Sequence, residues 1–449
     1  MPTLAQELDI PQAATIWPAS AFALATGSSL LIFGRLADIY GAYIVYVLGL
    51  AWYLVWSIIA GFSQNELMMD FSRALQGFGP AAFLSAGIGL LGSAYPPGPR
   101  KNMVFSIFGA MAPLGFFVGI FFSGLAGQLL DWRWYFWIGA ILITLPLITG
   151  ILTIPTDFRQ RSSTDLKMDW LGTFTIVPGL ALFTFAITDS AHAPNGWRTS
   201  YVYVTFILGC LFLAAGVYVE GWVAEQPLLP SSTFKFPYMK GLIASLFFSY
   251  GVLGVWLLYS TFYMQNVMGA EPLQIVAWYV PFGLGGLILS TLGGFVLHLI
   301  PNTILLLISS AGWVVSCLLF AIAPPGANYW AYILPAMIGG TIGIDISYNI
   351  TNIFITTTLP ANQQGIAGAI ANSALFLGIS IHLGFADMTA SSLESEGESK
   401  SFKAAFWYAM ACSIAALVIQ MLFVRIDKAK AVAVAEQITE ERADDKERV

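Results

Sequence analysis

Charged residues are scarce in this sequence. Asp, Glu, Lys and Arg make up 10% of the 449 residues, whereas hydrophobic residues make up 57%. Soluble domains contain roughly 25% charged and 45–50% apolar residues, so a water-soluble chain is excluded. The net charge of −6 leaves no basic surface for nucleic acid. The composition therefore predicts one unit embedded in a lipid bilayer.

Cysteine, histidine and phosphate-binding sequences are equally scarce. The three cysteines all lie in apolar runs, which argues against a disulfide framework. The three histidines are dispersed, without the spacing of metal ligands or of an intramembrane catalytic cluster. No Walker-type sequence points to ATP as an energy source. We therefore expect no enzyme activity, no metal and no cofactor.

Long apolar runs dominate the rest of the chain. Each is about 20 residues long, enough to cross the hydrocarbon core as a helix, and none alternates as a barrel strand would. The thirteen runs are Ala13–Gly34, Ala42–Phe62, Asp70–Ser93, Asn102–Ala126, Trp134–Ile154, Trp170–Thr188, Ser200–Trp222, Gly241–Met264, Leu273–His298, Asn302–Ile322, Tyr329–Thr357, Gln363–Phe385 and Ala404–Arg425.

Lysine and arginine fall mostly on one set of alternate connections and on the C-terminal tail. The positive-inside rule places that side in the cytoplasm, with Val449 inside and Met1 outside. Residues Met1 to Gln12 lack the pattern of a cleavable signal peptide. A chain of many spans that begins outside without such a signal predicts that one helix before Met1 is missing.

Four short motifs occur in order in the first third of the chain. With the stretch Asp345–Gly368, they resemble the major facilitator superfamily, and within it the fourteen-helix drug:proton antiporters of the fungal aminotriazole-resistance type. Two departures are Ala42 after the first motif, where basic residues are usual, and Ala112 where the third motif usually has glycine. The motifs are Gly34–Gly41, Arg73–Gly79, Gly109–Gly119 and Asp131–Phe136.

The resemblance implies an all-α polytopic membrane protein with the major facilitator fold. It has two six-helix halves related by an axis along the membrane normal, plus two central helices. The first helix is missing, which leaves about 13 spans. The implied division is 1–154 for five helices of the first half, 155–222 for the central loop and two extra helices, 223–425 for the second half and 426–449 for a charged cytoplasmic tail.

The resemblance also implies secondary active export of small amphipathic or toxic compounds in exchange for protons. The expected partners are a small-molecule solute, protons and the bilayer, with the plasma membrane as the first location and the vacuolar membrane as the alternative. Two other functions stay open. One is a facilitator or uptake carrier for a small nutrient or inorganic acid, and the other is a shortened form that no longer transports.

Asp345 is predicted to be the only carboxylate deep within an apolar run. A charge at a helix centre costs at least about 2.5–3.5 kcal/mol, so it normally faces a partner or a wet cavity. A polar stripe along a membrane helix is predicted to line a solute pathway, and Asn372 is a second candidate to line it. The alternative is that these residues form a hydrogen-bond ladder that only holds helices together. The polar residues that share the helix face of Asp345 at three- and four-residue steps are Thr341, Tyr348, Asn349 and Asn352.

Arg73 lies above a ridge of small residues that step by four along its helix. Small side chains allow a neighbouring helix to approach closely. The guanidinium could bias protonation of a nearby carboxylate or attract an anionic solute. The alternative is a structural ion pair with Asp70, three residues earlier. The ridge consists of Gly77, Ala81, Ser85 and Gly89.

The remaining motif residues are expected to act in gating and packing. Gly34, Asp38 and Gly41 form a short cytoplasmic turn, in which Asp38 caps or pairs with a helix end. Pro113 removes one helical hydrogen bond, and two glycines near it pack closely against a neighbouring helix. The resemblance implies a latch between the halves and an antiporter gate. The full set is Gly34, Arg35, Asp38, Gly41, Gln76, Gly77, Gly109, Pro113, Gly115 and Gly119.

Overall fold

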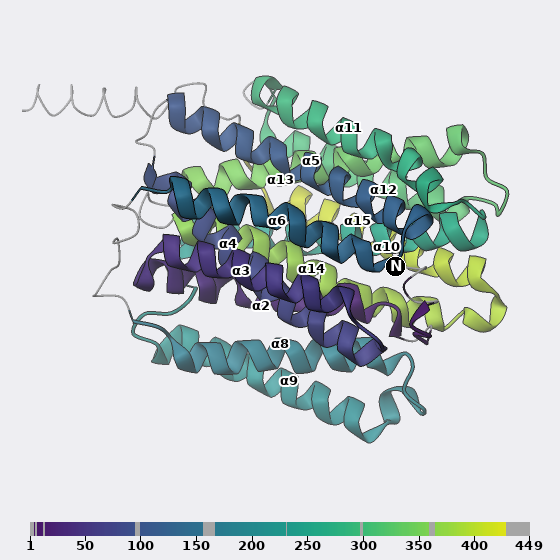
Figure 1. The fold of residues 1–449 in the computed structure, drawn as a ribbon, viewed down its shortest axis with the longest axis horizontal. Coiled ribbons are helices and arrows are strands. Elements are labelled where there is room, and N and C mark those ends of the chain that lie inside the picture. Colours follow the sequence, from purple (N-terminus) through teal and green to yellow (C-terminus); the bar gives the residue numbers. More distant parts are fainter. Residues whose placement is uncertain are drawn as a thin grey trace, which may run out of the picture.

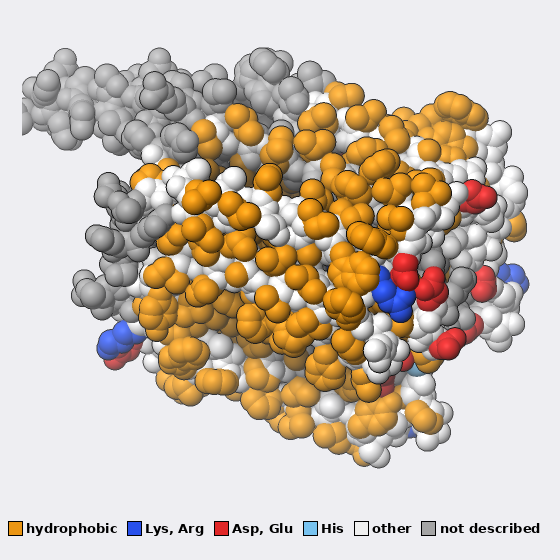
Figure 2. Space-filling model, in the orientation of Figure 1, with side chains coloured by type: hydrophobic (Ala, Val, Ile, Leu, Met, Phe, Trp, Pro, Cys, Tyr) orange, Lys and Arg blue, Asp and Glu red, His pale blue; other side chains and the backbone are white. Residues whose placement is uncertain are grey.

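The structure is a computed structural model that describes residues 4, 7–11, 14–94, 99–155, 167–229, 231–296, 300–358 and 364–427. Within these ranges every regular element is a helix. Thirteen helices there are long and apolar enough to cross a membrane, as the sequence predicts. They run roughly along one axis (Figure 1). Hydrophobic side chains cover most of the visible flank, and charged ones gather toward the ends (Figure 2).

The helices follow the predicted runs closely. The spanning helices are α2 (Trp17–Tyr40), α3 (Ala42–Gly61), α4 (Glu66–Ala94), α5 (Pro99–Leu129), α6 (Arg133–Thr153), α8 (Trp170–Ser190), α9 (Ser200–Tyr218), α10 (Met239–Phe262), α11 (Pro272–Val296), α12 (Asn302–Ile322), α13 (Leu334–Thr358), α14 (Gln364–Ser391) and α15 (Glu398–Phe423). Short π-helical turns extend α9 and α10 and precede α13.

Two boundaries differ from the prediction in a way that matters for function. Helix α2 continues to Tyr40, so Gly34 and Asp38 are helical and the turn lies at Gly41 alone. Gly41 has a φ of 98°, a conformation that favours glycine. Helix α14 continues past Phe385 to Ser391, which places Asp387 inside a membrane helix.

Helices α2, α3, α4 and α6 pack together, and so do α10, α12, α13, α14 and α15. Helix α5 packs on α6 of the first group, and α11 packs on α13 of the second, so each extends its group. The two groups meet where α14 packs on α2 and where α11 packs on α5. Helices α8 and α9 lie side by side along the lower edge of Figure 1, with α8 against α14. The four-part division stays a prediction. Its junction at 156–166 and its tail at 428–449 lie outside the described residues.

Candidate functional site

The carboxylate of Asp345 lies in the packed interior, on the face of α13 that meets α11. Its exposed fraction is 8%, and no salt bridge of the described residues includes it. Its Oδ2 atom lies 2.9 Å from the point where a Cβ of Gly286 would stand. Because glycine has no side chain, α11 leaves room for the carboxylate at this point.

Pro113 of α5 reaches the same glycine of α11. Its Cβ atom is also 2.9 Å from the Cβ position of Gly286. Phe117, one turn further along α5, packs onto Gly283 in the same way. The structure thus brings Pro113 and Asp345 together, on either side of one glycine in the contact between α5 and α11.

The other polar residues on α13 take different roles. The hydroxyl of Thr341 donates to the Phe282 carbonyl of α11 at 3.3 Å and to its own helix at Met337. The amide of Asn352 donates to the Tyr348 carbonyl at 2.9 Å. Thr341 therefore fits the ladder interpretation, whereas Asp345 does not. Asn349 is half-buried, and Asn372 is buried in α14.

Arg73 belongs to a separate cluster that joins α4 to α2 and α3. Its Nε atom donates to the Pro18 carbonyl at 3.0 Å, and its guanidinium lies 4.2 Å from the ring centre of Phe22. Gln76 accepts from Arg73 and donates to the Ser57 hydroxyl at 2.7 Å. The alternative of an ion pair with Asp70 is not found among the described residues, because acceptors on α2 and α4 orient the guanidinium instead.

Gly77, the first residue of the small ridge next to Arg73, packs closely on α2. A Cβ at Gly77 would meet the Phe22 carbonyl at 2.7 Å. The Thr26 hydroxyl donates to the Gly77 carbonyl at 2.9 Å. This close approach explains why glycine is needed there.

The first motif contacts three parts of the chain. Gly34 faces Ser85 of α4 and Ala369 of α14, so it lies where a latch between the halves would act. Arg35 donates to the Lys167 carbonyl at 3.1 Å and to a side-chain oxygen of residue 226, on the segments that flank α8 and α9. Asp38 does not cap α3, which begins without a side-chain cap.

The expected close packing at Gly115 and Gly119 is also wrong. Among the described residues no atom lies within 4 Å of either Cβ position. Between α5 and α11, the glycines that allow close approach are Gly283 and Gly286 on α11, and Gly124 on α5, which receives Val276. The third motif therefore packs through its proline onto glycines of another helix. The surroundings of Gly109 lie outside the described part of the structure.

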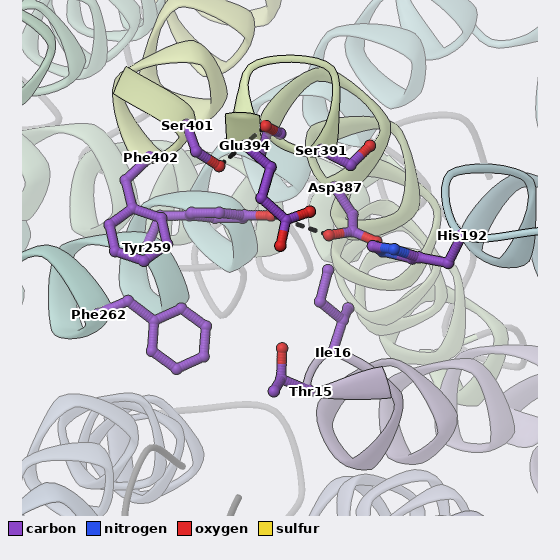
Figure 3. Close-up of a pocket in the computed structure, with 11 residues that line it drawn as sticks. Thr15, Ile16, His192, Tyr259, Phe262, Asp387, Ser391, Glu394, Ser401 and Phe402 are labelled. Atoms are coloured by element: carbon purple, nitrogen blue, oxygen red, sulfur yellow. Dashed lines mark hydrogen bonds and ion pairs between the residues drawn. The ribbon is translucent and has the colours of Figure 1, made fainter. Parts of the chain in front are cut away.

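A second buried carboxylate was missed because the predicted run ended at Phe385. Asp387 has an exposed fraction of 6% and forms an ion pair with His192, with Nε2 and Oδ2 2.6 Å apart. Figure 3 shows it between His192 and the hydroxyl of Tyr259, beside a small cavity. Ala386 and Ala390 continue the apolar pattern beyond Phe385 and are both buried. They were the feature of the sequence that could have extended the predicted helix to include Asp387.

The described residues contain no group of three or more metal-ligating side chains placed to hold a metal ion. The two candidate sites that remain are the buried carboxylates of Asp345 and Asp387. Asp345 lies near the middle of α13, and Asp387 lies near the end of α14 that adjoins the α8–α9 connection. Groups of this kind can bind and release protons.

Comparison with known proteins identifies the family of the chain. The family model of the Major Facilitator Superfamily matches residues 1–382. The low affinity ammonium transporter of Saccharomyces cerevisiae is 37% identical over 87% of this chain and 77% of its own. The aminotriazole resistance protein of the same yeast is 30% identical over 93% and 79%. The efflux pump terJ of Aspergillus terreus is 30% identical over 91% and 79%.

Solved structures show the same fold at low sequence identity. The peptide transporter POT superposes with a TM-score of 0.64 at 16% identity, covering 94% of this chain and 88% of that one. The nucleoside transporter NupG gives 0.62 at 12% identity, covering 94% of each chain. The chain thus belongs to the Major Facilitator Superfamily, among permeases similar to the aminotriazole resistance protein, and it is a multi-pass membrane transporter rather than an enzyme.

Proposed function

We propose that this transporter exports small amphipathic compounds in exchange for protons, and that Asp345 carries the exchanged proton. The observation that supports this most directly is the place of its carboxylate at the junction of α13, α11 and α5. Burying a carboxylate without a cation partner is costly. Such a group is stable there while it holds a proton, and it can release the proton when solute or water reaches it.

The neighbourhood of Asp345 offers a way to link this proton to movement. Helices α5 and α11 belong to the two packed groups and contact each other from Pro113 and Gly286 to Gly124 and Val276. A change in the volume or hydration of the Asp345 carboxylate acts directly on Gly286, and through it on Pro113. Protonation would thus bias the contact along which the two groups rock.

Transport of ammonium is the second candidate, because the relative with 37% identity is a low affinity ammonium transporter. Two probes separate the candidates. Cells that express the chain are loaded with labelled aminotriazole or with labelled methylammonium, and efflux is followed with and without a protonophore. We expect rapid aminotriazole efflux that the protonophore stops. Methylammonium movement with no aminotriazole efflux would contradict the export proposal.

The distribution of lysine and arginine predicts which end of the bundle faces the cytoplasm. We expect the connection after α12 to be outside and the turn after α2 to be inside. Single cysteines are introduced at Gly326 or Tyr40, both exposed, in a variant that lacks the three native cysteines. A membrane-impermeant thiol reagent should label Gly326→Cys in intact cells and Tyr40→Cys only after permeabilisation. The reverse pattern would invert the orientation and the direction of export.

A further inference from the structure

The ion pair of His192 and Asp387 lies where three parts of the chain meet. His192 comes from the α8–α9 connection, Asp387 from α14 and Tyr259 from α10. The hydroxyl of Tyr259 donates to Oδ1 of Asp387 at 3.5 Å, on the side opposite His192. Both carboxylate oxygens of Asp387 therefore have a titratable or hydroxyl partner, as Figure 3 shows.

A cavity of about 30 Å³ adjoins the pair. A volume of this size holds about two water molecules. Thr15 and Ile16, next to α2, form one wall, and Ser401 and Phe402 of α15 form another. Water-sized space beside a buried carboxylate gives a route for protons, and it is too small for a larger solute.

The charges that face His192 are all negative. They are Asp387 on α14, Glu394 in the connection to α15, and Asp189 at the end of α8. The walls from α2 and α15 contribute uncharged residues. No lysine or arginine of the described residues forms an ion pair with this cluster, and Lys400 pairs instead with Glu396.

These surroundings change the titration of His192. Burial alone would lower its pKa, but the hydrogen bond to Asp387 and the three negative charges outweigh burial, so the pKa of His192 is raised. Because the pKa of His192 is raised in the folded protein, the protonated pair stabilises the fold, and this stabilisation is fully present at pH values below the ordinary imidazole pKa. The proton and the stabilisation are both lost as the pH rises through the pKa that His192 has in the folded protein.

We propose that His192 and Asp387 form a second proton-binding site, distinct from Asp345, at the α8–α9 end of the bundle. The site takes one proton from the solution on that side and holds it between imidazole and carboxylate. Trp197 and Ser190 contact Met388 of α14 beside the pair, so the α8–α9 connection is held against α14 there. Proton binding at this site does not depend on the proposed function; only the use of the proton in export does.

The test is an imidazole NMR titration of the full chain in detergent. The chain has three histidines, so the signal that disappears in His192→Gln identifies His192. We expect its midpoint to lie above the ordinary value of about 6.5. In Asp387→Asn we expect the midpoint to fall by about one pH unit or more, because the paired charge is gone. Glu394→Gln, which removes a more distant exposed charge, should give a smaller shift.

Transport gives the second readout. Aminotriazole efflux is measured at fixed internal pH while the outer pH is varied. The wild type should lose efflux as the outer pH rises through the His192 midpoint, and this midpoint should move with Asp387→Asn. An NMR midpoint unaffected by Asp387→Asn would overturn the site. Identical outer-pH profiles for wild type and His192→Gln would also overturn it, provided that wild-type efflux depends on the outer pH. Failure of the export proposal differs, since efflux would then ignore the pH gradient while His192 still titrates as described.

Discussion

Replacement of Asp345 by asparagine should stop proton-driven export and leave the fold intact. Asparagine keeps the volume beside Gly286 but cannot exchange a proton. We expect efflux at the background level of cells without the protein. Because the protonated form of Asp345 proposed for the buried state is neutral, as asparagine is, stability should change by no more than about 1 kcal/mol. Efflux at matched expression and a thermal melt in detergent measure the two effects.

Two control variants sharpen this result. Asp427→Asn makes the same chemical change at an exposed position beyond α15 and should transport normally. Asp345→Glu keeps a titratable group and should restore part of the pH response, limited by its extra methylene against Gly286. Unchanged efflux with an unchanged pH response in Asp345→Asn would return Asp345 to a packing role.

Valine in place of Gly286 should impair transport almost as strongly. The first added carbon would stand 2.9 Å from both the Asp345 carboxylate and the Pro113 side chain, closer than packed carbon atoms approach. Overpacking of this kind costs about 1–3 kcal/mol. It also forces α5 and α11 apart at the point proposed to sense protonation. We expect a lower melting temperature and loss of aminotriazole efflux.

The matched control is Gly139→Val on α6, where no described atom lies within 4 Å of the Cβ position. This variant should keep its efflux and melting temperature. Gly286→Ala adds only the first of these carbons, and it should lower the melting temperature less than valine does and still transport poorly. Normal efflux in both Gly286 variants would show that the α5–α11 contact does not depend on this glycine.

The helices could be predicted because membrane spans are read from length and hydropathy along the chain. Asn302–Ile322 has the same bounds in the sequence and in α12. Asp345 could be singled out for the same reason, as a lone charge in an apolar run. The neighbours of Asp345 could not be predicted, because the contact of Pro113, Gly286 and Asp345 depends on how three helices pack.

The contacts that the sequence did not reveal have the same physical origin. Asp70 is the carboxylate nearest to Arg73 along the helix, yet the carbonyl of Pro18 on α2 is the better-placed acceptor. His192 and Asp387 are 195 residues apart, so spacing gave no hint that they pair. Tertiary contacts determine the partners of Arg73 and of Asp387, and the local periodicity of a sequence does not reveal such contacts.

Purified protein in sealed vesicles tests the central claim most directly. Labelled aminotriazole is placed at equal concentration on both sides, and a pH gradient is then imposed as the only driving force. If the chain exchanges protons for solute, aminotriazole will accumulate on the acidic side, and Asp345→Asn will abolish the accumulation. Concentrations that stay equal on both sides while labelled solute still exchanges would show a facilitator and contradict the account.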